Sequence, residues 1–411
     1  MPGTLEAEGG PHQAPHTMPT PGLSMLNKGW VARIDWGRWI RRLSFFVVGL
    51  ICSLWTYLLV STRFKVIESF DWVMFQDTAR LYLGSRIHEI YPGVTKDLPF
   101  FYPPYFVPLI APLGQLSKPW GYMTIVASMI AAMGAALLML RRVLPSDGPS
   151  YATGVLVVLS SASWNQMIVV GQLSALYLLI LVSTLLLWAR EKRMLAGAAL
   201  SLMMFKPNLG VMFPALLLLR RQWSLLTGWM LGFALLLLST LPLSPGIWLD
   251  YFNSGRSLAV AVGNQIPIWK QQTIYAFWRT ALDTPRSRII LTLWLISTIP
   301  LLIVTAKVWL RTRLDAEHLP RLFGLTVLAV LSCNVYMFAY DTLLLTLPGM
   351  VWYMQRSGYR SRGCWLVSGV ALLFIYFWQY LSLWINQGGW ALAGPTMAAW
   401  LIADARDLLS T

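Results

Sequence analysis

Apolar stretches long enough to cross a lipid bilayer recur along almost the whole chain. A helix needs about 20 mostly apolar residues to cross roughly 30 Å of hydrocarbon, and this sequence is 56% hydrophobic with only 12% charged residues. In lipid the backbone must satisfy its own hydrogen bonds, and runs of this length do so as helices. We therefore predict an all-α, multi-pass transmembrane protein with about 12 membrane segments. The predicted segments are 43–61, 120–140, 151–170, 173–189, 194–205, 209–219, 224–242, 287–310, 322–340, 342–355, 364–384 and 390–403.

Several of these segments are too short to be ordinary spans. Segments 194–205 and 209–219 meet at Lys206-Pro207-Asn208, which predicts a tight hairpin or a broken helix. Irregular backbone is tolerated at membrane depth only where it lines a cavity or is buried in protein. In segment 224–242, Gly228 and Gly232 form a GxxxG pattern, which is typical of close helix packing.

The positions of the basic residues predict the orientation of the chain, because short cytoplasmic loops are enriched in Lys and Arg. If the N-terminus is inside, the clusters at 141–142, 190–193, 220–221, 307–321 and 356–362 all lie on the cytoplasmic face. This topology accounts for most of the net charge of +15 and needs no nucleic-acid partner. It also requires the proline-rich stretch 100–119 to be re-entrant or interfacial rather than a crossing.

The same reading divides the chain into regions. Residues 1–27 are rich in Pro, Gly and Thr and are expected to be a disordered tail. Residues 28–42 are basic with interleaved Trp, which favours an amphipathic segment on the membrane surface. The transmembrane domain is predicted at 43–403. It contains a first outer loop at 63–119 and a second large outer loop at 243–286, and it is followed by a cytoplasmic tail at 404–411.

The first outer loop concentrates polar chemistry in an otherwise hydrophobic protein. Ser69 and Asp71 stand where the cap of a helix belongs, and apolar residues then recur at helical spacing up to Gly84. We predict an amphipathic helix over 71–83 that lies along the outer membrane face, with Asp71 at its positive end.

Polar residues from distant parts of the chain reach the same outer face in this topology. An outward-facing cavity of acids, amides, one lysine and aromatic rings suits a sugar-like head group on a lipid, because Tyr and Trp stack on sugar rings and amides bind hydroxyls. Lys206 and Arg80 are candidates for contact with a phosphate. The alternative for Lys206 is that its ammonium snorkels to the membrane surface beside a proline kink, and the alternative for Arg80 is that it balances the charge of the outer acids. The candidate substrate-binding residues are Lys206, Gln172, Tyr102, Asp341, Gln272 and Arg80.

Five stretches carry a resemblance to a known family. They are FDWVMFQDTARLYLG, FYPPYFVPLIAPLGQLS, the segment from VVGQLS to LLLLRRQW that contains FKPN, NQIPIWKQQTIYAFWR, and SCNVYMFAYDTLLLTLPG. In this order they resemble glycosyltransferase family 87, a group of bacterial transferases that use polyprenyl-phosphate sugars and include α-mannosyltransferases. The resemblance runs from about residue 43 to 355.

The resemblance implies a GT-C fold with outer-face amphipathic helices and an active site that faces the periplasm or exterior of a bacterial inner (plasma) membrane. It implies transfer of a monosaccharide, such as mannose or another hexose, from a polyprenyl phosphate donor to a glycolipid or glycan acceptor, with inversion. In such enzymes an Asp early in the first outer loop acts as the general base, and the matching residue here is Asp71. We expect Asp77, the rival acid, to pair with Arg80 instead. We expect no cofactor and no catalytic metal.

Two other functions remain open. Broken helices also suit a transporter or flippase of a lipid-linked or polar substrate, although we find no repeated half in the hydropathy pattern. A non-catalytic membrane scaffold is the third hypothesis, and the converging polar residues argue against it. For Asp71 itself, the ordinary alternative to catalysis is a helix cap.

Overall fold

The computed structural model describes residues 71–93, 100–144, 151–264, 271–282, 287–355, 358–385 and 391–410, together with single positions between 39 and 54. Nearly all of them belong to one compact unit, Arg42–Thr411. The other unit, Met1–Arg41, is represented only by the exposed, helical Trp39. The predicted tail at 1–27, the basic segment at 28–42 and most of the first predicted crossing lie outside the described residues.

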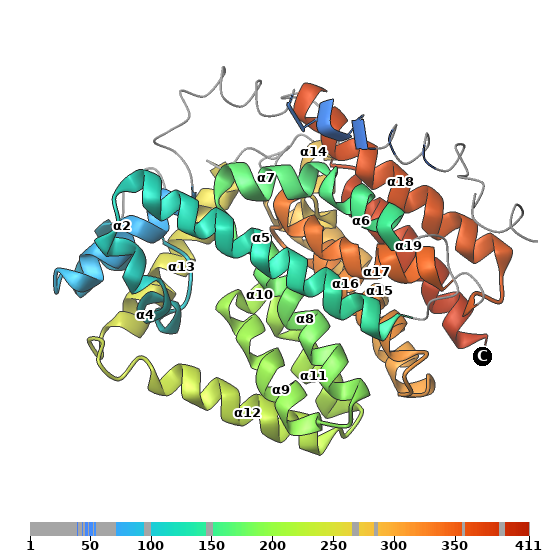
Figure 1. The fold of residues 1–411 in the computed structure, drawn as a ribbon, viewed down its shortest axis with the longest axis horizontal. Helices are drawn as coiled ribbons and strands as arrows, with labels where there is room; N and C mark the ends of the chain where they lie inside the picture. Colours follow the sequence, from blue (N-terminus) through green and yellow to red (C-terminus); the bar gives the residue numbers. More distant parts are fainter. Residues whose placement is uncertain are drawn as a thin grey trace, which may run out of the picture. The chain divides into compact units, whose positions relative to one another are not determined.

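The protein is all-helical over these described ranges, which confirms the predicted class (Figure 1). They contain no β-strand, and one isolated bridge joins Gln271 to Phe338. The first half contains α2 Asp71–Leu83, η3 Ile87–Glu89, α3 Ile90–Gly93, η4 Pro104–Phe106, α4 Val107–Ile110, η5 Ala111–Gln115, α5 Lys118–Val143, α6 Tyr151–Leu159, α7 Ala162–Val170, α8 Ser174–Ala189, α9 Arg193–Ser201, η6 Leu202–Phe205 and α10 Pro207–Gly210. The second half contains α11 Met212–Leu219, α12 Trp223–Leu238, α13 Ile247–Asn264, α14 Ile274–Leu282, α15 Ser287–Arg311, α16 Leu319–Cys333, η8 Ala339–Leu345, α17 Thr346–Met354, α18 Arg362–Ile385 and α19 Ala393–Leu409.

Three helices among the described residues are long and apolar enough to cross a membrane. They are Lys118–Val143, Arg288–Arg311 and Arg362–Ser382, which match the crossings predicted at 120–140, 287–310 and 364–384. The predicted crossing at 151–170 is a bent pair, α6 and α7, with an angle of 49° between them. The predicted crossings at 173–189, 194–205, 209–219, 224–242 and 322–340 coincide with shorter apolar helices, such as α8 and α12 with 16 residues each. The protein is a membrane protein, with three or four helices of spanning length in the part of the chain that is described.

One predicted crossing, 322–340, ends earlier than expected. Helix α16 stops at Cys333, where Asn334 adopts an extended backbone with ψ 155°. The Asn334 side chain then donates to Asn208 O at 2.8 Å, and Gln272 N donates to Met337 O at 2.8 Å. Residues 334–338 are therefore not part of a continuous helix, because their polar groups bind other segments rather than the preceding turn.

The proline-rich stretch before α5 is built from short pieces. Its three helices, η4, α4 and η5, have five residues or fewer, too few to cross a bilayer. Their lengths agree with the expectation that this stretch does not cross. Tyr105, Phe106 and Val107 are buried there, and the segment packs against α2.

Helices α9 and α12 pack at backbone contact distance, as the GxxxG pattern predicts. A Cβ added at Gly228 would lie 2.0 Å from Met194 O, and one added at Gly197 would lie 1.9 Å from Leu225 O. At Gly232 the nearest atom would be Ser201 Oγ at 2.3 Å. Glycines on both helices therefore allow the close approach.

Replacing Gly228 by Leu is expected to force α9 and α12 apart. The added side chain meets backbone atoms that have no room to move, and overpacking of this kind costs about 1–3 kcal/mol or more. Thermal unfolding of the purified protein in detergent should show a lower midpoint. Gly255→Leu is the control, because a Cβ at Gly255 would meet nothing within 4 Å, and an equal loss in both variants would contradict the packing role.

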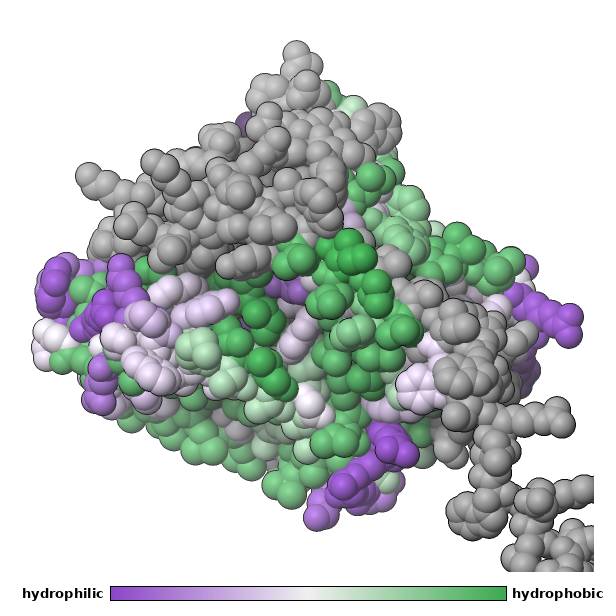
Figure 2. All heavy atoms as spheres, turned by 45° about the horizontal axis from the view of Figure 1, so that its top comes forward, coloured by the Kyte–Doolittle hydropathy of each residue, from purple (hydrophilic) through white to green (hydrophobic). Residues whose placement is uncertain are grey.

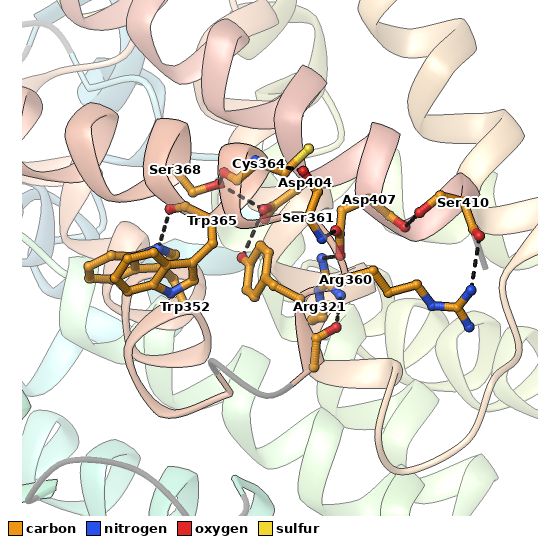
Figure 3. Close-up of polar contacts among 12 residues, drawn as sticks. Arg321, Trp352, Arg360, Ser361, Cys364, Trp365, Ser368, Asp404, Asp407 and Ser410 are labelled. Atoms are coloured by element: carbon orange, nitrogen blue, oxygen red, sulfur yellow. Dashed lines mark hydrogen bonds and ion pairs between the residues drawn. The ribbon is translucent and has the colours of Figure 1, made fainter.

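A buried polar network joins the C-terminal helix α19 to α16 and α18 (Figure 3). Arg321 Nη2 pairs with Asp407 Oδ2 at 2.9 Å, and both side chains are almost fully buried. Asp404 Oδ1 accepts from Tyr359 OH at 2.8 Å and from Ser368 Oγ at 3.0 Å. Most of the segment predicted as a tail, 404–411, is thus helix that packs in the interior, because its two acids have buried partners.

Apolar side chains also cover much of the outside of the protein. Figure 2 shows broad hydrophobic areas, with the hydrophilic side chains gathered in a few clusters. The long helices contribute many of the exposed apolar residues, which include Met123, Ile130 and Leu138 on α5, Met230 and Leu235 on α12, Ile296 and Ile303 on α15, and Val370 and Phe377 on α18. Such a surface is stable in contact with lipid rather than water.

Candidate active site

Helix α2 places Asp71 in its first turn, as predicted. A carboxylate there is stabilised by the partial positive charge of the helix N-terminus. The helix is held in place by Gln76, which is fully buried and whose Nε2 donates to Leu113 O at 3.3 Å, Leu116 O at 2.9 Å and Ser117 O at 3.3 Å. Because these carbonyls belong to the end of η5 and the start of α5, Gln76 fixes the position of α2 relative to the proline-rich stretch. This role of Gln76 is not predicted from the sequence.

A chain of side-chain contacts leads to the Asp71 carboxyl. Tyr91 OH donates to Tyr102 O at 2.8 Å, and Tyr102 OH donates to Gln172 Oε1 at 3.0 Å. The Nε2 of Gln172 donates to Asp71 Oδ2. Both Tyr102 and Gln172 are buried, with exposed fractions of 7% and 4%. Residues 71, 102 and 172, far apart in the sequence, therefore form one polar cluster.

The end of helix α7 brings Gln172 to this cluster. Ser161 caps the start of α7 by accepting from Trp164 N at 3.2 Å, and the helix ends because Gly171 adopts a left-handed backbone with φ 73°. The N–H groups of Gly171 and Gln172 both donate to Met167 O, at 2.9 and 3.0 Å. Trp72, the neighbour of Asp71, packs directly on Gly171.

Replacing Gly171 by Ala is expected to disturb the site and the fold together. The left-handed backbone costs a residue with a Cβ about 1–2 kcal/mol, and the new Cβ would lie only 2.6 Å from Trp72 Cβ. The thermal midpoint should fall, and any activity should fall further because Trp72 and Asp71 must move. Gly134→Ala provides the control, since a Cβ at Gly134 has nothing within 4 Å. Equal behaviour of the two variants would exclude this role of Gly171.

A second polar cluster surrounds Lys206, at the break between η6 and α10. Lys206 Nζ pairs with Asp341 Oδ1 at 2.5 Å, and the two side chains are 12% and 1% exposed. Lys206 Nζ also lies 5.3 Å from the centre of the Tyr340 ring. Asp341 Oδ2 accepts from Phe338 N at 3.2 Å. Burial of an unpaired ammonium or carboxylate lowers the stability of the folded protein, so each of these two groups stabilises the other.

Gln271 and Gln272 lie beside this second cluster. Their backbone runs next to 337–338 through the Gln271–Phe338 bridge and the bond from Gln272 N to Met337 O. Gln272 is 1% exposed. The side chain of Gln271 is fully buried, and neither its nitrogen nor its oxygen has a hydrogen-bond partner in the described part of the chain. Gln271 is not among the site residues predicted from the sequence.

Ring contacts join the two clusters, because Tyr102 stacks on Phe106 with centres 4.6 Å apart, and Phe106 lies 5.5 Å from Phe205, the neighbour of Lys206. Burial raises the pKa of Tyr102 well above its ordinary value, and the carboxyls of Asp71 and Asp341 add to this increase. The pKa of Tyr340 is raised by burial first and then by the same two carboxyls. Both phenols are therefore neutral, and the structure brings together Asp71, Gln172, Tyr102, Lys206 and Asp341, which the sequence places on one outer face.

Arg80 does not join this group. It lies nine residues after Asp71, which is about 13 Å along a helix axis. Its guanidinium pairs with Asp77 Oδ1 at 3.5 Å and donates to Leu116 O at 3.2 Å. The expected Asp77–Arg80 pair is confirmed, whereas a substrate contact of Arg80 stays a prediction.

The sequence signals for the residues that were missed are weak. Tyr340 stands next to Asp341, and Tyr91 and Gln76 lie within the first outer loop, but a single Tyr or Gln carries no spacing that marks a site. Within the described ranges, no three His, Cys, Asp or Glu side chains lie close enough together to hold a metal.

Comparison with known proteins adds one finding. The model of glycosyltransferase family 87 matches residues 100–338, more than half of the chain and most of the residues described above. No curated protein and no solved structure matches the chain.

Proposed function

The chain belongs to glycosyltransferase family 87, and on that premise we propose that it transfers a monosaccharide from a polyprenyl phosphate to a glycolipid or glycan acceptor. The observation that carries the proposal is that two polar clusters lie side by side: the Asp71 carboxylate bonded by Gln172, and the buried Lys206–Asp341 pair. Contacts of Phe106 with Tyr102 and Phe205 join them. We place the reaction at the outer face of a bacterial plasma membrane, from the positive-inside orientation of the loops.

In this proposal Asp71 is the general base. The acceptor hydroxyl attacks the anomeric carbon of the donor, a new C–O bond forms, and the bond from that carbon to the phosphate oxygen breaks with inversion. The hydroxyl proton passes to the Asp71 carboxylate, and the polyprenyl phosphate leaves with the electron pair. A positioned carboxylate contributes about 10²–10⁴-fold to such a step.

Lys206 is the proposed partner of the donor phosphate. The developing charge on the leaving phosphate needs cationic or N–H donors, and Lys206 Nζ is the ammonium that lies beside both Asp341 and the Tyr340 ring. Asp341 orients the ammonium, while the side chains of Gln272 and Tyr102 supply amide and phenol groups for sugar hydroxyls. Mannose is the sugar that the family resemblance favours.

A transfer assay with purified protein in liposomes tests this function. A panel of radiolabelled polyprenyl-phosphate sugars is offered with a glycolipid or glycan acceptor fraction, and label is expected to move from one donor into the acceptor. Absence of transfer from every donor, combined with counterflow of intact labelled lipid across the liposome membrane, would contradict the enzyme and favour the transporter.

A further inference from the structure

The chain of contacts that ends on Asp71 assigns a role to Gln172. Resting on the proposed function, we propose that Gln172 is a positioning residue whose amide, oriented by Tyr102, holds the Asp71 carboxylate ionised and directs its second oxygen toward the acceptor hydroxyl. This role differs from a direct contact with substrate. It follows from how both ends of the Gln172 amide are used.

The orientation of the amide is determined by its two neighbours. A carboxylate accepts hydrogen bonds and does not donate them, so the group facing Asp71 Oδ2 is the amide N–H. The amide oxygen therefore faces Tyr102, whose phenol donates to it at 3.0 Å. A flipped amide would set an oxygen against the carboxylate, which is repulsive.

The amide is also fixed in space. Gln172 follows the left-handed Gly171, its backbone N–H donates to Met167 O at 3.0 Å, and its side chain is almost fully buried. Tyr102 is held in turn, because Tyr91 OH donates to its carbonyl at 2.8 Å and its ring stacks on Phe106 with centres 4.6 Å apart. A rigid donor on Oδ2 fixes the direction of Oδ1, the second carboxyl oxygen.

The charges around Asp71 give the direction of the pH effect. In the described part of the chain, the titratable and charged groups around it include Tyr102, Tyr340, Asp341 and, paired with Asp341, Lys206. Asp341 is a like charge and opposes ionisation of Asp71, whereas a donated hydrogen bond favours the ionised form. Loss of the Gln172 amide removes that donor, so ionisation of Asp71 requires a higher pH. The acidic limb of the rate profile should then move upward.

The test compares Gln172→Leu, Gln172→Glu and Tyr102→Phe with wild type. In Gln172→Leu, kcat should fall about 10–100-fold, which corresponds to the free energy of one hydrogen bond to a charged group. The KM for the donor should change little. The acidic limb should move to higher pH, and further in Gln172→Glu, which adds a like charge. Tyr102→Phe should give a smaller change in the same direction. The Gln172 amide can still donate to Asp71 in this variant, but it loses the phenol that orients it.

Gln166→Leu is the matched control. Gln166 lies in α7, the helix that leads to Gln172, and its side-chain nitrogen has no hydrogen-bond partner among the described residues. This variant should keep the wild-type pH profile. An unchanged profile in Gln172→Leu, or an equal shift in Gln166→Leu, would overturn the proposal.

A second measurement does not depend on sugar transfer. Carbodiimides react with protonated carboxyls, so mass spectrometry of the peptide that contains Asp71 reports the pH at which this side chain ionises. The midpoint of labelling should be higher in Gln172→Leu and Gln172→Glu than in wild type. If wild type transfers no sugar but the midpoint shifts, the proposed function fails and the contact between Gln172 and Asp71 stands. If wild type is active and the midpoint does not move, only the role of Gln172 fails.

Discussion

Asp71→Asn is expected to lower the rate of sugar transfer by about 10²–10⁴-fold, the usual contribution of a positioned general base. Asn has nearly the same shape as Asp and still ends the chain of contacts from Tyr102 and Gln172. It cannot take the proton of an acceptor hydroxyl, however. Binding of the donor should change little, because the loss concerns the transition state rather than the ground state. Initial rates with saturating donor, together with the KM for the donor, measure both effects.

Asp77→Asn is the matched control for this prediction. It makes the same chemical change on the same helix, six residues away, where the carboxyl is partly exposed and pairs with Arg80 at 3.5 Å. Surface pairs of this kind are worth about 0–1 kcal/mol, so activity and stability should stay near wild type. A wild-type rate in Asp71→Asn, or an equal loss in both variants, would remove Asp71 from the role of base.

Asp341→Asn is expected to lower the free energy of unfolding by about 3–5 kcal/mol, the cost of leaving one member of a buried ion pair alone. Asn can still accept from Phe338 N, so the variant isolates the charge that faces Lys206. Lys206→Met should cost a similar amount, because it strands a carboxylate that is only 1% exposed. Thermal and denaturant unfolding in detergent micelles measure these losses.

The double variant Lys206→Met/Asp341→Asn separates stability from function. It leaves no unpaired charge, so it should be more stable than either single variant. If Lys206 binds the donor phosphate, the double variant should still have a strongly raised KM for the donor. Recovery of both stability and donor affinity would show that the pair serves the fold alone. Glu191→Ala is the control, since its pair with Arg193 at 2.7 Å is exposed and should be worth little.

The sequence is most informative where the physics is local. The helix at 71–83 follows from a cap position, apolar residues at helical spacing and a terminal glycine, and α2 has the predicted bounds. The long spans at α5, α15 and α18 follow from apolar length alone. The close contact of α9 and α12 follows from Gly228 and Gly232, because only small residues let two helix backbones meet.

The sequence pattern does not predict helix ends or burial where segments far apart in the chain form hydrogen bonds with each other. Helix α16 ends at Cys333 because Asn334 donates to Asn208 O and Gln272 N donates to Met337 O. A hydropathy pattern carries no information about such hydrogen bonds. The same is true of 404–409, where the two acids favour an exposed tail by composition. In the folded protein they lie in the interior, because Arg321 and Tyr359 arrive from other parts of the chain to pair with them.

Residue patterns alone predict an all-helical membrane protein that resembles glycosyltransferase family 87, and they point to Asp71, Gln172, Lys206 and Asp341 as site residues. Those conclusions rest on residue type, spacing and apolar length, which are properties of the chain. The hydrogen bond from Gln172 to the Asp71 carboxyl and the pairing of Lys206 with Asp341 join residues 101 and 135 positions apart, and both depend on the folded protein. Partners at such separations are chosen by how the helices pack, since burial makes each unpaired polar group costly enough to select its neighbour.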